Sequence, residues 1–313
     1  MIGRGRNLSE ARDEIVIPVR GNQPTRLDVF LRESLAWKSR TRIQNLIRSG
    51  YVSVNVDSPP STKPSMVVRA GDRITVRLSR GVGMPDYSQL ELEILYEDPF
   101  ILGLNKPPGM LVHPVGRHVY DTLMNYLHYR YRKAMDASSE FHLRRCHRSD
   151  KDTTGVLRVG KDNFVHRSVQ RQLEQRIMSK EYHALVVGHV PSDLNAIDRP
   201  IAEGRDLASA LNGPGLKQSK TKIRVLRRFR DYTLVAANPV TGRQNQIRVH
   251  LAAVGHPLVG DERYSGPPSP DGFPPRFNLH ARHLQFYHPR LKSIVELTAP
   301  LPAELEELLE QLS

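Results

Sequence analysis

A segment rich in glycine, proline and serine separates two parts of the chain whose hydrophobic patterns differ. Residues 79–90, SRGVGMPDYSQL, have the composition of a linker. Ahead of this segment apolar residues recur at helical spacing, whereas behind it short strand-like runs dominate. A chain of 313 residues is long enough for two domains, each with a buried core. We therefore predict an N-terminal extension over residues 1–24, a small domain over 25–80, a linker over 81–90 and a larger domain over 91–313.

The small part shows the pattern of two short helices followed by two strands. Thr25 and Asp28 form a helix-start pattern, and a second helix is expected to begin at Ser39 and to end at Gly50. Alternating valines after Gly50, and then the sequence AGDRITVRL, predict two strands. These elements predict a small α/β domain. The side chains expected to face its core are Leu27, Phe30, Leu31, Leu35, Ile43, Leu46, Ile47, Val52, Val54, Val56, Ile74, Val76 and Leu78.

Positive charge is concentrated in this small part. The chain carries 46 Lys and Arg against 33 Asp and Glu, a formal net charge of +13. Residues 1–80 hold 15 of these basic residues and 7 of the acidic ones, so most of the excess lies there. A basic surface favours a polyanion such as nucleic acid as the partner. Three arginines of the second helix lie outside its apolar face: Arg40, Arg42 and Arg48. They either form an ordinary solvated face or contact phosphates.

The larger part combines many short strands with a few helices. Helices are expected in TLMNYLHYRYRKAM, in FVHRSVQRQLEQR and, after Pro302, in PAELEELLEQL. The proline-rich stretch 266–275 is expected to be an exposed loop. Because the expected strands and helices do not alternate regularly along the chain, we predict an α+β fold on a mainly antiparallel mixed sheet with flanking helices and loops. The strand-like runs are LELEILYED, PFILGLNKP, GVLRVGK, YHALVVGHV, KIRVLRRF and YTLVAANPV.

Cysteine and histidine usage argues against several kinds of site. The single cysteine, Cys146, excludes an intrachain disulfide and a multi-cysteine zinc site, and we interpret it as structural rather than nucleophilic. The spacing of the thirteen histidines supports no metal site. No apolar run approaches the roughly 18 residues that a membrane span requires, and residues 1–20 are too charged for a signal peptide. We therefore expect a soluble, cytoplasmic protein without a membrane partner.

Four further motifs follow one another along the chain. They are LNKPPGMLVHP (104–114), HRSDKDTTG (147–155), KEYHALVVG (180–188) and GRQNQIRVHLAAVGHPLVGDERY (242–264). Together they resemble the RluA/RluD type of pseudouridine synthase. The basic second helix, Gly50 and the strand YVSVN resemble the small RNA-binding domain first seen in ribosomal protein S-four, which such enzymes often carry at the amino end. The resemblance implies a monomeric isomerase that uses no cofactor and modifies structured RNA, with large-subunit ribosomal RNA as the favoured substrate.

The resemblance also assigns roles to individual residues. Conversion of uridine to pseudouridine moves the ribose from N1 to C5 of the base, and Asp150 matches the aspartate that serves as nucleophile. Arg248 matches the arginine that keeps this carboxylate charged. Arg148 matches the residue that fills the space left by the extruded base, and Tyr182 matches the tyrosine that stacks on it. Ile247 is expected to supply an apolar wall. Since a tyrosine pKa of about 10 makes a poor base at neutral pH, stacking is the favoured role of Tyr182.

Other interpretations of these residues remain open at this point. Asp150 and Asp152 could cap a turn, and we favour capping for Asp152 only. Tyr182 could be an ordinary strand aromatic. Lys106 and Lys180 could contact RNA or be solvated. As a whole, the chain could also be an inactive RNA-binding assembly factor, whereas an aspartate phosphatase would require a second carboxylate set for magnesium that we do not find.

Several positions depart from the family's usual pattern. The signature usually reads HRLD and TSG, where this chain has Ser149 and Thr154, and apolar residues usually precede it, where this chain has two arginines. The usual GRTHQIR is GRQNQIR here, with Gln244 and Asn245. Asn245 replaces an imidazole near Arg248. These departures concern the packing of the pocket and the choice of substrate, whereas Asp150, Tyr182 and Arg248 are retained.

Overall fold

A computed structural model describes most of the chain, in two compact units. One unit comprises the described residues of Met1–Pro85 and Pro114–Asp121, and the other those of Asp86–His113 and Thr122–Ser313. The side chain of Arg42 lies outside the description. The described residues are 14–20, 23–35, 40–55, 59–61, 63–77, 85–115, 118, 120–146, 149–264, 266, 269 and 275–313.

The small unit packs two helices against a three-stranded antiparallel sheet. Its core contains the predicted apolar residues that the structure describes, with Phe30 and Leu46 only partly buried. Residues 14–18, which the sequence analysis assigned to an N-terminal extension, form the strand that pairs with residues 73–77 of the sheet. A separate two-stranded ladder joins β2 and β4. The elements are β1 (Glu14–Pro18), β2 (Thr25–Arg26), α1 (Leu27–Ser34), α2 (Arg40–Arg48), β3 (Val52–Val54), β4 (Val67–Val68) and β5 (Arg73–Arg77), with β5 central in the sheet.

The two predicted helix ends of the small unit have different outcomes. Gly50 has a φ of +73°, the left-handed conformation that terminates helices, as its predicted role requires. The predicted start at Thr25 is wrong, because the N-cap is Arg26 and no side chain caps the helix. Asp28 is buried and instead binds the Arg26 guanidinium, with N–O distances of 3.0 and 3.1 Å. This ion pair replaces the cap that Asp28 was expected to complete.

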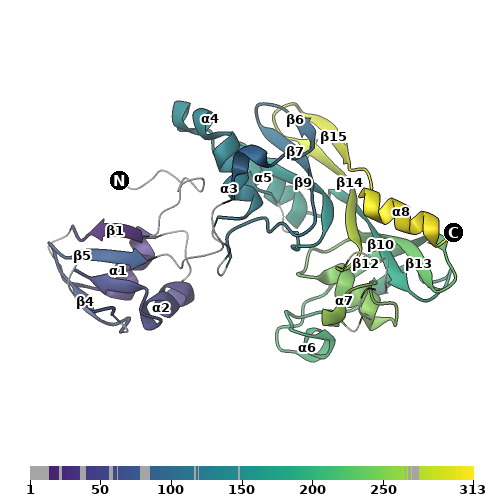
Figure 1. Cartoon of the computed structure of the whole chain (residues 1–313), viewed down its shortest axis with the longest axis horizontal. Helices are drawn as coiled ribbons and strands as arrows, with labels where there is room; N and C mark the ends of the chain where they lie inside the picture. Colours follow the sequence, from purple (N-terminus) through teal and green to yellow (C-terminus); the bar gives the residue numbers. More distant parts are fainter. Residues whose placement is uncertain are drawn as a thin grey trace. The chain divides into compact units, whose positions relative to one another are not determined.

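The larger unit is built on a single ten-stranded sheet, shown in Figure 1. Its strands pair antiparallel except for β9 and β14, which are parallel. The predicted α+β class and the mainly antiparallel sheet are therefore confirmed. The order is β11-β12-β13-β10-β14-β9-β7-β6, with β15 on β14 and β8 on β9. The bounds are β6 (Ile94–Glu97), β7 (Ile101–Lys106), β8 (Arg144–Arg145), β9 (Thr154–Gly160), β10 (Ser179–Val187), β11 (Ala196–Asp198), β12 (Lys220–Arg228), β13 (Tyr232–Pro239), β14 (Leu279–His288) and β15 (Ser293–Thr298).

Helices cover this sheet where the sequence places apolar stripes. On α5 (Asn163–Glu174), Val165 and Val169 are buried in a core shared with β7, β9 and β14. On α8 (Ala303–Gln311), Leu305 and Leu308 pack against residues of β10 and β13. The predicted helix after residue 122 is present as two short helices. The remaining helices are η1 (Tyr87–Gln89), α3 (Leu123–Arg130), α4 (Arg132–Ala137), α6 (Leu207–Asn212), α7 (Gln246–Ala253) and η2 (Glu262–Tyr264).

Several elements were not predicted from the sequence. Strands β14 and β15, and helices α6 and α7, were absent from the expected set. Seven of the eight residues of α7 are buried, so the helix has no polar face to reveal its period. This matters for function because α7 carries Arg248. Among the described residues, no helix is long and apolar enough to cross a membrane.

Candidate active site

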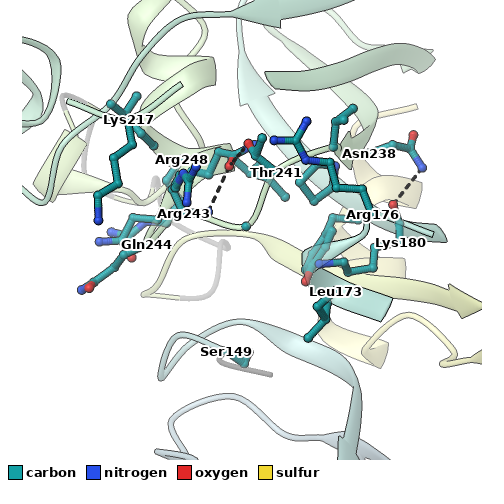
Figure 2. Close-up of a pocket in the computed structure, with 18 of the residues that line it drawn as sticks. Ser149, Leu173, Arg176, Lys180, Lys217, Asn238, Thr241, Arg243, Gln244 and Arg248 are labelled. Carbon is teal, nitrogen blue, oxygen red and sulfur yellow. Dashed lines mark hydrogen bonds between the residues drawn. The ribbon is translucent and has the colours of Figure 1, made fainter. Parts of the chain in front are cut away.

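The larger unit contains a cavity of about 1270 Å³ that is lined by residues of three of the four motifs, 147–155, 180–188 and 242–264. Its walls come from the loop ahead of β9, the turn between α5 and β10, the end of β13 and the start of α7. Figure 2 shows side chains from these segments pointing into the space. Asp150, Tyr182, Ile247 and Arg248 all line it. The fold therefore brings together four predicted site residues from three segments that are far apart in the sequence.

Asp150 occupies the loop that leads into β9. Its side chain keeps 31% of its surface exposed, so the carboxylate is open to the cavity. Oδ2 lies 3.4 Å from Nη1 of Arg248. The predicted ion pair between these residues is thus present, but the distance is long for a charge-assisted hydrogen bond.

Arg248 has a closer partner that the sequence analysis missed. Its Nε and Nη2 donate to the two carboxylate oxygens of Asp261, at 2.7 and 2.6 Å, and both side chains are almost fully buried. Its guanidinium carbon also lies 4.0 Å from the ring centre of Phe277 and 4.9 Å from that of Tyr264. Burial works against the charge, but the hydrogen bonds and charge of Asp261 raise the pKa of Arg248 above its ordinary value. Arg248 is therefore a permanent, rigidly held cation.

Tyr182 and Ile247 form apolar parts of the wall. Tyr182 is half-buried on β10, and Ile247 is 6% exposed at the start of α7. Burial, together with the charge of Asp150, raises the pKa of Tyr182 to about 12. The phenol is therefore protonated at neutral pH. It can stack on a base and donate a hydrogen bond, but it is unsuited to accept a proton there.

Lys106 has neither of the two roles left open by the sequence. It is 1% exposed, so it is not a solvated lysine and does not present its charge to an external ligand. Its ammonium donates to the carbonyls of Pro107, Met110 and Lys151, at 2.7, 2.9 and 2.8 Å. Burial lowers the pKa of Lys106 to about 7. Because Lys151 follows Asp150, Lys106 ties the loop that carries Asp150 to the turn after β7.

A further group of basic side chains lines the cavity, and only Lys180 among them was considered from the sequence. In Figure 2, Lys217 and Arg243 lie on one side of the space and Arg176 and Lys180 on the other. Lys222 also lines the cavity. Otherwise the sequence analysis assigned phosphate contacts to the small part, because the basic excess is concentrated there. Nothing in the local sequence indicates that these five cations, from residues 176–180, 217–222 and 243, line the same cavity.

The other predicted site residues fall elsewhere or outside the described residues. Arg148 lies outside them, and of Arg42 only the helical backbone is described. Arg40 and Arg48 are exposed on α2 of the small unit, and one guanidinium nitrogen of Arg40 lies 3.8 Å from Asp28.

Two residue types give no further candidate site among the described residues. Cys146 is fully buried, and burial raises the pKa of its thiol, as expected for a structural cysteine. In the described part of the chain, no group of three or more His, Cys, Asp or Glu side chains is arranged to hold a metal ion.

Known proteins similar to this chain share one activity in their names. Residues 101–253 match the family described as RNA pseudouridylate synthase, and residues 25–74 match the S4 domain. An uncharacterized RNA pseudouridine synthase of Bacillus subtilis, YlyB, is 37% identical over 92% of this chain and 94% of its own length. Ribosomal large subunit pseudouridine synthase C of Vibrio cholerae is 34% identical over 92% of this chain and 93% of its own.

Further relatives and a solved structure agree with this result. Ribosomal large subunit pseudouridine synthase D of Buchnera aphidicola is 32% identical over 91% of this chain and 93% of its own length. The solved structure of human RNA pseudouridylate synthase domain containing 4 superimposes with a TM-score of 0.57 at 27% identity. The match covers 70% of this chain and 92% of the human one.

Proposed function

Because the chain belongs to the RNA pseudouridine synthase family and is an enzyme that isomerises uridine in RNA, we propose that Asp150 is its nucleophile and large-subunit ribosomal RNA its substrate. The supporting observation is the convergence of Asp150, Arg248 and Tyr182 on one cavity from a loop, a helix and a strand. A carboxylate, a fixed cation and a protonated aromatic are the groups that the resemblance calls for. The geometry makes them available to a single nucleoside.

In the proposed reaction, the target base enters the cavity and stacks on Tyr182. The Asp150 carboxylate attacks the nucleoside while the bond from C1′ to N1 breaks. The base then turns, C5 bonds to C1′, and the bond between the nucleoside and the Asp150 carboxylate breaks, which returns the free carboxylate. C5 loses its proton and N1 gains one, so atoms and electrons balance without an external reagent. Arg248 holds a positive charge beside the carboxylate throughout.

The apolar and basic surroundings suit an extruded nucleotide. Extrusion from an RNA fold costs roughly a few kcal/mol, which contacts inside the pocket and to the backbone must offset. We assign the apolar wall to Ile247, the filling of the vacated space to Arg148, and phosphate contacts to the rim cations Arg176, Lys217 and Arg243. Cations on both sides of the opening would bind the strand ahead of and behind the target.

The small domain supplies affinity in this proposal. The S4 domain match over residues 25–74 supports RNA binding by the part predicted at 25–80. We assign backbone contacts to Arg40, Arg42 and Arg48 on α2. Two relatives carry names that specify the large ribosomal subunit, which supports the same class of RNA here.

The decisive experiment compares pseudouridine maps of total RNA from cells with the protein, without it, and with the Asp150→Asn variant. We expect one or more uridines in large-subunit ribosomal RNA to remain unmodified in the last two strains. Asp150→Asn keeps the size of the side chain but removes the charge, so RNA binding should be nearly unchanged. Asp193→Asn, an exposed aspartate outside the cavity, is the matched control. Native modification by Asp150→Asn would refute the assignment.

A further inference from the structure

Asn245 makes the closest contacts to the Asp150 carboxylate that the structure describes. Its amide lies between Asp150 and Tyr264 and satisfies both in one orientation. The nitrogen then donates to the two carboxylate oxygens, at 2.9 and 3.0 Å, and the oxygen accepts from the Tyr264 hydroxyl, at 2.7 Å. The nearest atom of Arg248 is farther away, at 3.4 Å. Asn245 therefore spans both oxygens of the proposed nucleophile, whereas Arg248 reaches one.

The backbone around Asn245 is built to hold this position. Asn245 is the N-cap of α7 and has a φ of +55°, a left-handed conformation that asparagine tolerates better than most residues. The next side chain, Gln246, is buried and fully hydrogen-bonded. It accepts from the Thr241 hydroxyl and the Arg243 amide, and donates to the Lys220 carbonyl and the Thr221 hydroxyl. This network fixes the turn, so the amide is presented in one place.

Three other described side chains that can carry a charge and face Asp150 either bind other partners or are uncharged at neutral pH. Arg248 on α7 forms its short hydrogen bonds with Asp261, whose negative charge balances it. Lys106 on β7 acts on Asp150 through space, but its ammonium donates to three carbonyls. Tyr182 on β10 is uncharged at neutral pH. Among the described residues, Asn245 is thus the group that contacts the carboxylate at ordinary hydrogen-bond distance.

We propose that Asn245, held by Tyr264, is the positioning residue that orients the Asp150 carboxylate and keeps it ionised. Hydrogen bonds to a charged carboxylate favour its ionised form. An amide does this without a charge of its own, and therefore without titrating. In the usual family motif an imidazole stands at this position. Its replacement by Asn245 removes a group that ionises near neutral pH, so the acid limb of the reaction should reflect Asp150 alone. This inference rests on the proposed role of Asp150.

The test is the pH dependence of single-turnover isomerisation, with enzyme in excess over large-subunit ribosomal RNA transcribed in vitro with 5-tritiated uridine. Release of tritium reports the reaction at C5. For Asn245→Ala we expect the acid limb to move to higher pH by about one unit, so that the rate on that limb falls by up to about tenfold relative to the native enzyme at the same pH. Asn245→Asp places a second carboxylate within about 3 Å of Asp150, so the two must share a proton and the acid limb should move further.

Two further variants separate positioning from general damage. Tyr264→Phe removes only the hydroxyl that holds Asn245 and keeps the ring beside Arg248. It should shift the acid limb in the same direction by a smaller amount, and it should add little to Asn245→Ala. Asn195→Ala, at an exposed asparagine outside the cavity, should leave the profile unchanged. RNA binding, measured separately, should be similar in all variants.

The outcomes distinguish this inference from the proposed function. If Asn245→Ala lowers the rate equally at every pH and leaves the acid limb in place, Asn245 has only a structural role and the inference fails. The same holds if Asn245→Asp retains the native profile. If instead the native enzyme releases no tritium from this RNA, while cellular maps show no uridine that depends on it, the proposed function itself fails.

Discussion

Removing one partner of the buried Arg248–Asp261 pair should destabilise the larger unit as well as impair catalysis. Asp261 is 2% exposed, and Arg248→Ala would leave its carboxylate buried without the two hydrogen bonds of 2.6 and 2.7 Å. Breaking a buried ion pair in this way costs about 3–5 kcal/mol. We therefore expect the free energy of unfolding to fall by about 4 kcal/mol in Arg248→Ala and similarly in Asp261→Ala. This is a large share of the roughly 5–15 kcal/mol typical of a folded domain.

Replacement of both residues provides the internal comparison. Arg248→Met with Asp261→Leu removes both charges and keeps much of the buried volume, so neither charge of this pair is left buried alone. We expect this double variant to be more stable than either alanine variant, although it should be inactive. Loss of activity in Arg248→Ala must accordingly be measured on folded protein, because unfolding would otherwise be counted as a catalytic effect.

Urea unfolding of the full chain, followed by far-ultraviolet circular dichroism, measures this prediction. The single tryptophan, Trp37, belongs by sequence to the small part, so its fluorescence gives a separate transition that should not move. If the free energy of unfolding falls by less than about 1 kcal/mol in both alanine variants, the buried pair contributes no more to stability than an exposed ion pair does, which would contradict the prediction. Equal destabilisation of the double variant and the single variants would also contradict the reasoning.

The remaining predictions concern RNA affinity, pH and the pocket tyrosine. Simultaneous replacement of Arg40, Arg42 and Arg48 on α2 by alanine should weaken RNA binding. It should also reduce the dependence of the logarithm of the binding constant on the logarithm of the salt concentration, by about one unit of slope for each lost phosphate contact. An unchanged slope would indicate that these arginines form a solvated face. The buried His128 and His280 have pKa values lowered by burial to about 4. In the unfolded chain the two imidazoles bind protons near pH 6.5, whereas in the folded protein they do so only near pH 4. The free energy of unfolding should therefore be highest above pH 6.5 and decrease as the pH falls towards 4. Urea unfolding midpoints at pH 7.5 and pH 5 measure this decrease. His280→Gln should flatten this dependence. Tyr182→Phe keeps the aromatic ring and removes only a hydroxyl that is protonated at neutral pH. Its single-turnover rate should therefore be clearly higher than that of Tyr182→Ala. Equal reductions of the rate in the two variants would argue against stacking.

Periodic patterns in the sequence were sufficient for much of the fold. The apolar stripes of α5 and α8 reflect helices with one buried face, and β9, β10 and β13 were predicted from short apolar runs. Such patterns are local, so they can be read without knowledge of what packs against them. They failed for α7, because a helix buried on nearly all sides carries no amphipathic signal.

The motifs likewise identified the central residues of the site but not their connections. Asp150, Tyr182, Ile247 and Arg248 were chosen by resemblance, and the fold places all four at one cavity. Arg248, which was matched to the arginine that keeps Asp150 charged, lies beside that carboxylate, but its short hydrogen bonds go to Asp261. Both aspartates were visible in the sequence, but their relative distances were not.

The amino-acid sequence by itself determined the class of the fold, the basic small part and the chemical groups available for catalysis. Only the tertiary structure decided which of those groups contact one another. In the structure Lys106 binds the loop that carries Asp150, Asp261 forms the short hydrogen bonds with Arg248, and Asn245 contacts the Asp150 carboxylate. The physical reason is that hydrogen bonds and ion pairs depend on separations of about 3 Å, and chain folding sets those separations between residues up to about a hundred positions apart.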